Sequence, residues 1–302
     1  MEKDKSILIF GDSHSRAFKG ISIPGYKIDL HAISSGSILG LPKLSSHLNI
    51  SKTILETSKK TPPEFLILKL GQVDIENIFL YKKYISEKDS FKEKEFTDRV
   101  INSYETFIDT LKANKNIKHI AICGITPPAP KSTAKIVNHY YHSMVSKMTK
   151  AKAKSWNHII KNPEFLKDLE YPNRISRSIK FNSMLKGLCK KQSIIYFEVF
   201  NDLLKDGIIN KEFEGCNYHI KGTNHTEKNQ PPYPKVKQLL QDALASILQN
   251  NPRDKPSPHS PKCIPFVTPP HHIIFKTIPH IFSHQPLPYN LYPIPIHQLH
   301  LY

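Results

Sequence analysis

The feature that most constrains the fold of this 302-residue chain is the alternation of short apolar runs with longer amphipathic segments. The apolar runs have the length of strands, and the segments between them carry apolar residues at helical spacing. This alternation, which continues to about residue 250, is typical of a mainly parallel sheet with helices on both faces. We therefore predict an α/β fold. The predicted strands are 6–10, 26–32, 65–70, 119–124 and 193–199, and the predicted helices are 93–114, 177–189 and 233–248.

A change of composition divides the chain near residue 251. Residues 251–302 hold 12 of the 24 prolines and seven of the 16 histidines, so a packed fold is not expected there. Proline removes backbone donors and interrupts helices and central strands, which predicts an extended, mostly disordered low-complexity tail. The main domain is expected to span residues 1–250. Within it, residues 132–173 are predicted to form a helical insertion that either covers a site or is a solvated helix pair.

The net charge and the spacing of the cysteines limit which partners, metals and cofactors are expected. The net charge of +17 favours anionic partners, but the lysines are scattered and form no recognisable nucleic-acid-binding module, so this role stays a secondary alternative. The four cysteines lack the C-x-x-C spacing of zinc and redox sites, and the tail histidines lack a fixed ligand geometry, so we expect no metal or cofactor. Neither a leader peptide nor an apolar stretch of membrane-spanning length is found, which predicts a cytoplasmic protein.

The motif Gly11-Asp12-Ser13-His14 directly follows the first predicted strand. In an open α/β sheet, ligands bind beyond the carboxyl ends of the strands, so a serine here points into the expected site. A serine hydroxyl becomes a nucleophile when a base takes its proton and donors hold the resulting oxyanion. Ser13 is therefore a candidate nucleophile supported by Asp12. The alternative is that Asp12, Ser13 or Ser15 only caps the following helix.

Together with three later segments, this motif resembles, in order, the blocks of the SGNH (GDSL-like) hydrolase superfamily. The second block is similar to Ser34–Ile38, the third to Gly71–Asp74, and the last to Asn217–His219. The resemblance covers roughly residues 6 to 248. It implies a three-layer, flavodoxin-like SGNH hydrolase fold for the main domain and hydrolysis of esters.

The resemblance also implies roles for individual residues. Ser13 would be the nucleophile and His219 the base. The oxyanion would be held by the N–H groups of Ser13 and Gly36. Asp74 would order its loop. Apart from the resemblance, the position of Arg16 one turn beyond Ser13 would let it hold an anionic group of the substrate, and the alternative is a surface ion pair.

The third block departs from the family pattern. Val73 stands where the family has an asparagine whose amide donates to the oxyanion, and valine has no donor. Gln72 or Asn77 could supply an amide instead, and we take Gln72 as the candidate. The alternative for Gln72 is a polar residue with no part in the reaction.

The last block departs as well. Cys216 stands where the family has an acid, three residues before His219. That acid normally fixes the tautomer of the base. The chain would then use a Ser–His dyad or a nearby carboxylate, and His225 is an alternative base. The nearby carboxylates are those of Asp202, Asp206 and Glu214.

The sequence thus predicts a serine esterase, with an O-acetyl or other short acyl group on a glycan as the first candidate substrate. One alternative is a catalytically impaired SGNH-like module that binds a glycan or an anionic ligand. A second alternative is a basic protein associated with nucleic acid. The oligomeric state is not predicted.

Overall fold

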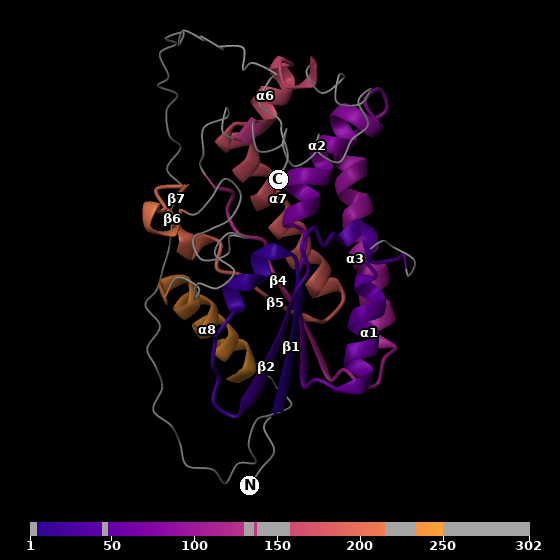
Figure 1. Cartoon of the computed structure of the whole chain (residues 1–302), viewed down its shortest axis with the longest axis vertical. Helices are drawn as coiled ribbons and strands as arrows, with labels where there is room; N and C mark the ends of the chain where they lie inside the picture. Colours follow the sequence, from indigo (N-terminus) through magenta and orange to yellow (C-terminus); the bar gives the residue numbers. More distant parts are fainter. Residues whose placement is uncertain (1–4, 44–47, 130–135, 138–157, 215–233, 250–302) are drawn as a thin grey trace, which may run out of the picture. The chain divides into compact units, whose positions relative to one another are not determined.

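The computed structural model describes residues 5–43, 48–129, 136–137, 158–214 and 234–249. Their main feature is a five-stranded sheet with the order β2-β1-β3-β4-β5 (Figure 1). All four neighbouring pairs are parallel, and this is the strand order of flavodoxin-like folds. The prediction of an α/β fold with a mainly parallel sheet is confirmed. The strands are β1 (Lys5–Gly11), β2 (Tyr26–Ala32), β3 (Phe65–Lys69), β4 (His119–Cys123) and β5 (Ile195–Phe197).

Helices cover both faces of the sheet, as predicted (Figure 1). Along each buried strand, successive side chains point to opposite faces, so each strand contributes to two cores. Leu66 and Leu68 of β3 pack in the core with α1 (Ile50–Lys60), α3 (Glu93–Lys112) and α7 (Tyr171–Lys191), whereas Phe65 and Ile67 of the same strand pack in the core with α8 (Pro234–Gln249). Lys69, two residues after Ile67, continues this alternation on the face that α8 covers.

The predicted helices are present, with bounds that differ by a few residues. The helix predicted at 177–189 begins six residues earlier, at Tyr171, because Pro172 suits the first turn of a helix. No described helix combines the length and the apolar character that crossing a membrane requires. The longer helices are α1 (Ile50–Lys60), α3 (Glu93–Lys112), α6 (Pro163–Leu169), α7 (Tyr171–Lys191) and α8 (Pro234–Gln249). The short helical segments are η1 (Ser13–Phe18), η2 (Ile38–Gly40), η3 (Asp74–Ile78), α2 (Phe79–Tyr81), η4 (Lys82–Ser86), η5 (Asn201–Leu203) and η6 (Lys211–Phe213), and a hairpin pairs β6 (Leu204–Lys205) with β7 (Ile208–Ile209).

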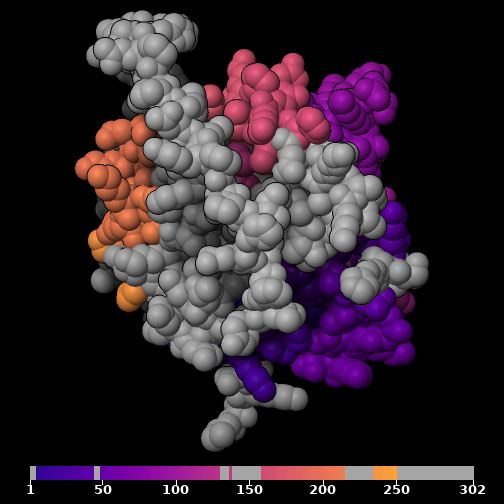
Figure 2. Space-filling model, turned by 45° about the horizontal axis from the view of Figure 1, so that its top comes forward, coloured from indigo at the N-terminus to yellow at the C-terminus, as the bar shows by residue number. Residues whose placement is uncertain are grey.

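The predicted insertion at 132–173 is described only in part. Its described portion contains α6 and the start of α7. At the surface, α6 lies beside the segment that follows β3 (Figure 2). There Asp168 accepts hydrogen bonds from Lys83 and from the hydroxyl of Tyr84, both at 2.7 Å. The predicted low-complexity tail lies outside the described residues and stays a prediction.

Candidate active site

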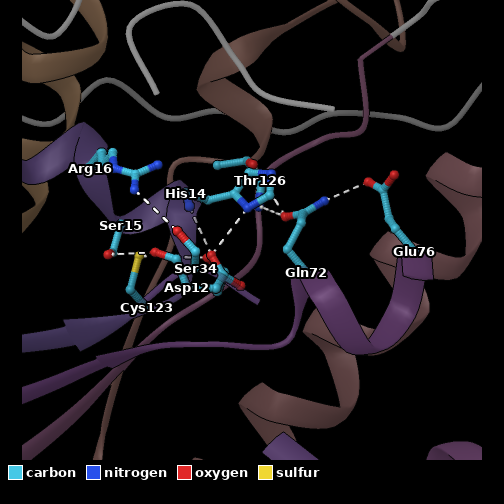
Figure 3. Close-up of polar contacts among 10 residues, drawn as sticks. Asp12, His14, Ser15, Arg16, Ser34, Gln72, Glu76, Cys123 and Thr126 are labelled. Atoms are coloured by element: carbon cyan, nitrogen blue, oxygen red, sulfur yellow. Dashed lines mark hydrogen bonds and ion pairs between the residues drawn. The ribbon is translucent and has the colours of Figure 1, made fainter. Parts of the chain in front are cut away.

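Ser13 lies at the carboxyl end of the first strand. β1 ends at Gly11, and η1 begins at Ser13. The side chain of Asp12 caps η1, because its Oδ1 accepts the backbone N–H of His14 at 2.9 Å. The same oxygen lies 3.1 Å from Nδ1 of the His14 ring (Figure 3). Capping and nucleophile functions are therefore compatible in this turn: Asp12 fixes the backbone, and Ser13 is the first residue of η1, 5% exposed.

Asp12 is a buried carboxylate with an unusual environment. Burial acts to raise its pKa, but the charge and hydrogen bonds of His14, together with the charge of Lys69, bring the pKa below its ordinary value. Asp12 is therefore ionised at neutral pH, which makes it a strong hydrogen-bond acceptor. Its other oxygen, Oδ2, has no hydrogen-bond partner among the described residues.

The loop after β2 carries the predicted second block. The guanidinium of Arg16 donates to the Ser34 hydroxyl at 3.3 Å, which connects this loop to η1 (Figure 3). The backbone N–H of Gly36, the predicted oxyanion donor, donates to the carbonyl oxygen of Ile33 at 3.1 Å. To hold an oxyanion, Gly36 would have to share or leave this bond.

Asp74 joins the loop after β3 to the loop after β2. It is fully buried, and its carboxylate accepts the backbone N–H groups of Ile38 at 2.8 Å and Leu39 at 3.2 Å. Burial raises the pKa of Asp74 to about 7, and the two N–H donors only partly offset that effect. Asp74 thus bonds the two loops to each other, and its role in ordering a reactive site stays a prediction.

Gln72 has a different orientation from the one that the sequence predicted. Its side-chain nitrogen donates to Glu76 at 2.7 Å, and its oxygen accepts the backbone N–H of Thr126 at 3.1 Å (Figure 3). The Thr126 donor fixes which end of the amide is the oxygen. The amide nitrogen therefore points at Glu76, and the prediction that it stabilises an oxyanion does not fit this geometry. Gln72 instead connects the loops after β3 and β4.

The contacts of Gln72 continue into a buried ion pair. Glu76 accepts from the guanidinium of Arg174 at 2.6 Å, and Arg174 also donates to the carbonyl oxygen of Ala129 at 2.8 Å. Arg174 belongs to α7 and is 1% exposed. The loops after β3 and β4 are thus anchored to the same helix.

A second residue of α7 fixes the exit of β4. Asn182 accepts the N–H of Ile125 at 2.8 Å and donates to its carbonyl oxygen at 3.0 Å. It also donates to Glu198 at 2.8 Å, just beyond β5. Gly124 precedes this loop, and a Cβ there would lie 2.5 Å from the Tyr196 hydroxyl, so glycine permits the close packing.

Four buried residues of this region escaped the sequence analysis: Lys69, Glu76, Arg174 and Asn182. The spacing of Gln72 and Glu76 is four residues, which places the two side chains together on a helix and could have indicated that pair. Arg174 and Asn182 look like ordinary polar positions of an amphipathic helix. Lys69 interrupts an apolar strand, and that interruption was the available signal.

Several candidate residues lie outside the described part of the chain. These include His219, its alternative His225, and Cys216, so the identity of the base stays a prediction. Among the carboxylates considered as substitutes for the missing acid, Asp202 and Asp206 are exposed and Glu214 is partly buried. Within the residues described, no three His, Cys, Asp or Glu side chains are grouped so that they could hold a metal ion.

Comparison with known proteins gives similarity at the level of structure alone. No family model matches the sequence, and no curated protein matches it. A carbohydrate acetylesterase from Sinorhizobium meliloti is 14% identical with a TM-score of 0.46, and the match covers 81% of this chain and 98% of that one. A GDSL-like lipase from Bacteroides thetaiotaomicron is 11% identical with a TM-score of 0.44, and the match covers 82% and 90%.

A catalytic mutant of an acetylxylan esterase from Geobacillus stearothermophilus is 11% identical with a TM-score of 0.45, and the match covers 82% of this chain and 94% of that one. All three likenesses are distant. The solved structures to which this chain is similar thus include a GDSL-like lipase and two acetylesterases.

Proposed function

We propose that this chain is a serine esterase in which Ser13 attacks the carbonyl carbon of an ester. The observation that carries the proposal is the position of Ser13. It begins the turn after β1, at the edge where the carboxyl ends of the parallel strands meet. Asp12 orders this turn, and the loops after β2, β3 and β4 are bonded around it.

The reaction follows from a serine nucleophile. An imidazole, which we assign to His219 with His225 as the alternative, takes the proton of the Ser13 hydroxyl as its oxygen bonds to the carbonyl carbon. The oxyanion of the tetrahedral intermediate is held by N–H groups of Ser13 and Gly36. The imidazolium protonates the leaving alcohol, and water, deprotonated by the same imidazole, then releases the acid and frees Ser13.

The substrate that we favour is a short acyl ester, such as an O-acetyl group on a glycan. Ser13 and the adjoining His14 are both nearly buried, and this burial supports a small acyl group rather than a long one. Arg16 lies at the edge of the turn and contacts the exposed loop residue Ser34, where it could meet a polar or anionic part of the alcohol.

The test is hydrolysis of p-nitrophenyl acetate by the full chain. Ser13→Ala should lower kcat/KM by at least about a thousandfold, because the nucleophile is lost. Ser34→Ala is the matched control, since it removes an exposed hydroxyl from the neighbouring loop and should retain most of the activity. A fluorophosphonate probe should label the wild type at Ser13. Equal hydrolysis by the wild type and by Ser13→Ala would reject the assignment.

A glycan-binding module without turnover is the second candidate, and one observation favours it. The two predicted oxyanion donors besides Ser13 both bond within the protein: Gly36 to Ile33, and Gln72 to Glu76. A folded wild-type protein that ignores the fluorophosphonate probe but binds acetylated glycans would support this candidate over the esterase.

A further inference from the structure

Lys69 is the last residue of β3 and lies in an unexpected place for a lysine. Its side chain follows Phe65 and Ile67 on the face of the sheet that α8 covers, and the residue is 2% exposed. Among the described residues its Nζ has no hydrogen-bond partner. A buried, unpaired amine is costly to keep, because the interior does not replace the water that it loses. Proteins keep such unfavourable groups chiefly at functional sites, where the charge has a role.

The backbone of Lys69 contacts the nucleophile turn directly. The N–H of Asp12 donates to the carbonyl oxygen of Lys69 at 3.1 Å. Gly11 pairs with Lys69 in the sheet, and a Cβ on Gly11 would lie 2.5 Å from that oxygen. The turn that presents Ser13 is therefore built against Lys69.

The charge of Lys69 acts on Asp12. It stabilises the ionised carboxylate, against the effect of burial. The carboxylate has one oxygen, Oδ1, committed to His14 and another, Oδ2, without a hydrogen-bond partner among the described residues. Asp12 and Lys69 thus each carry an unsatisfied polar atom in the same interior, although no direct ion pair joins them.

We propose that the buried ammonium of Lys69 is the positioning charge of the nucleophile turn: it keeps Asp12 ionised, so that Asp12 holds the backbone and the ring of His14 beside Ser13. This inference rests on the proposed function for its catalytic consequence, but its electrostatic part stands by itself. Lys69 acts through Asp12 and does not touch the substrate.

Other ionisable groups surround Asp12, and the charge of His14, like that of Lys69, favours the ionised carboxylate. His14 is its hydrogen-bonded neighbour in the turn, and apart from Lys69 the groups on other elements are acids that carry no positive charge in either protonation state. Lys69 is the cation that acts on Asp12 from a neighbouring strand. The groups on other elements that interact with Asp12 are Asp74 of η3, Tyr104 of α3 and Cys123 of β4.

The first test measures stability, so its result does not depend on turnover. Thermal unfolding at neutral pH is compared for the wild type, Lys69→Met, Asp12→Asn and the double variant. In the wild-type background, Lys69→Met should lower Tm, because the Asp12 carboxylate loses its compensating charge. In the Asp12→Asn background the same substitution should raise Tm, because the ammonium is then the uncompensated charge.

The proposal is tested by whether Lys69→Met lowers or raises Tm in each of the two backgrounds. A shift of the same sign and size in both backgrounds would overturn it, since Lys69 and Asp12 would then be uncoupled. If Lys69→Met alone does not fold, the comparison of Asp12→Asn with the double variant still tests the proposal. A double variant whose Tm equals or is lower than that of Asp12→Asn would contradict it. Cys123→Ala is the matched control: it alters a neutral group near the same lysine and should leave the coupling intact.

The second test uses the pH profile of kcat/KM. In Lys69→Met the acid limb should move to higher pH by about one unit, which is about a tenfold loss at a pH on that limb. A simple packing defect would instead lower kcat/KM by the same factor at every pH, and that result would contradict the positioning role. A wild type without turnover would reject the proposed function, and the stability measurements would still decide the electrostatic coupling.

Discussion

The carboxylate of Asp74 accepts the backbone N–H of Ile38 at 2.8 Å, so the loop after β3 holds the loop after β2 by a direct bond. Both loops border the turn that carries Ser13. The candidate oxyanion donor Gly36 lies two residues before Ile38, so its position depends on a buried acid that lies 36 residues after Ile38 along the chain. This dependence has a measurable pH signature.

Asp74→Asn should change how stability depends on pH. Burial raises the pKa of Asp74 from 3.8 to about 7, so between these values the folded chain keeps a proton that the unfolded chain releases. Stability from this group is present below the lower value and is lost as pH rises through the higher one, at up to about 1.4 kcal/mol per pH unit. Urea unfolding across this window should therefore give a flatter profile for Asp74→Asn. Identical slopes in the two proteins would argue against the raised pKa.

Gln72→Ala should affect stability more than turnover. The substitution removes the buried hydrogen bonds that Gln72 makes with Glu76 and with the N–H of Thr126, at a cost of about 1–3 kcal/mol. A direct oxyanion donor would instead reduce kcat by about 10²–10³. Urea unfolding and kcat, both measured where the variant is folded, separate the two roles. Thr126→Val is the control, because it removes only the weaker hydroxyl contact and keeps the backbone N–H.

Arg174→Met should destabilise the chain by about 3–5 kcal/mol, because it leaves the Glu76 carboxylate buried and without its cation. The double variant Arg174→Met/Glu76→Gln should recover part of this loss, since no buried charge remains. The measurement is the free energy of unfolding in urea. A double variant that is as unstable as the sum of the single variants would mean that the two residues act independently.

Gly11→Ala should be strongly destabilising. The new Cβ would lie 2.5 Å from both the carbonyl oxygen of Lys69 and the Cβ of Ser15, so backbone must move. Overpacking of this kind costs about 1–3 kcal/mol or more. Gly187→Ala is a matched control of opposite sign: it lies in α7 with open space around it, and alanine should stabilise the helix by about 0.5–1 kcal/mol. Thermal unfolding compares the two.

The strands of the fold were predictable because each is a short run of residues whose pattern indicates a strand without reference to the rest of the chain. β2 has the predicted bounds, β3 and β4 each end one residue earlier than predicted, β1 is longer by one residue at each end, and β5 is shorter by two residues at each end. The position of Ser13 followed from the same reasoning, because a motif after the first strand must lie at the carboxyl edge. The orientation of Gln72 was not predictable, because it depends on Thr126 from the loop after β4 and, through Glu76, on Arg174 of α7. Local sequence contains no information on which distant side chain completes a hydrogen bond.

The bridge from Thr126 through Gln72 and Glu76 to Arg174 has a practical consequence for redesign. A segment grafted after β3 that lacks Gln72 and Glu76 would remove the carboxylate that pairs with the buried guanidinium of Arg174. Redesign of the loop after β3 therefore requires changing the loop after β4 and position 174 of α7 together with it.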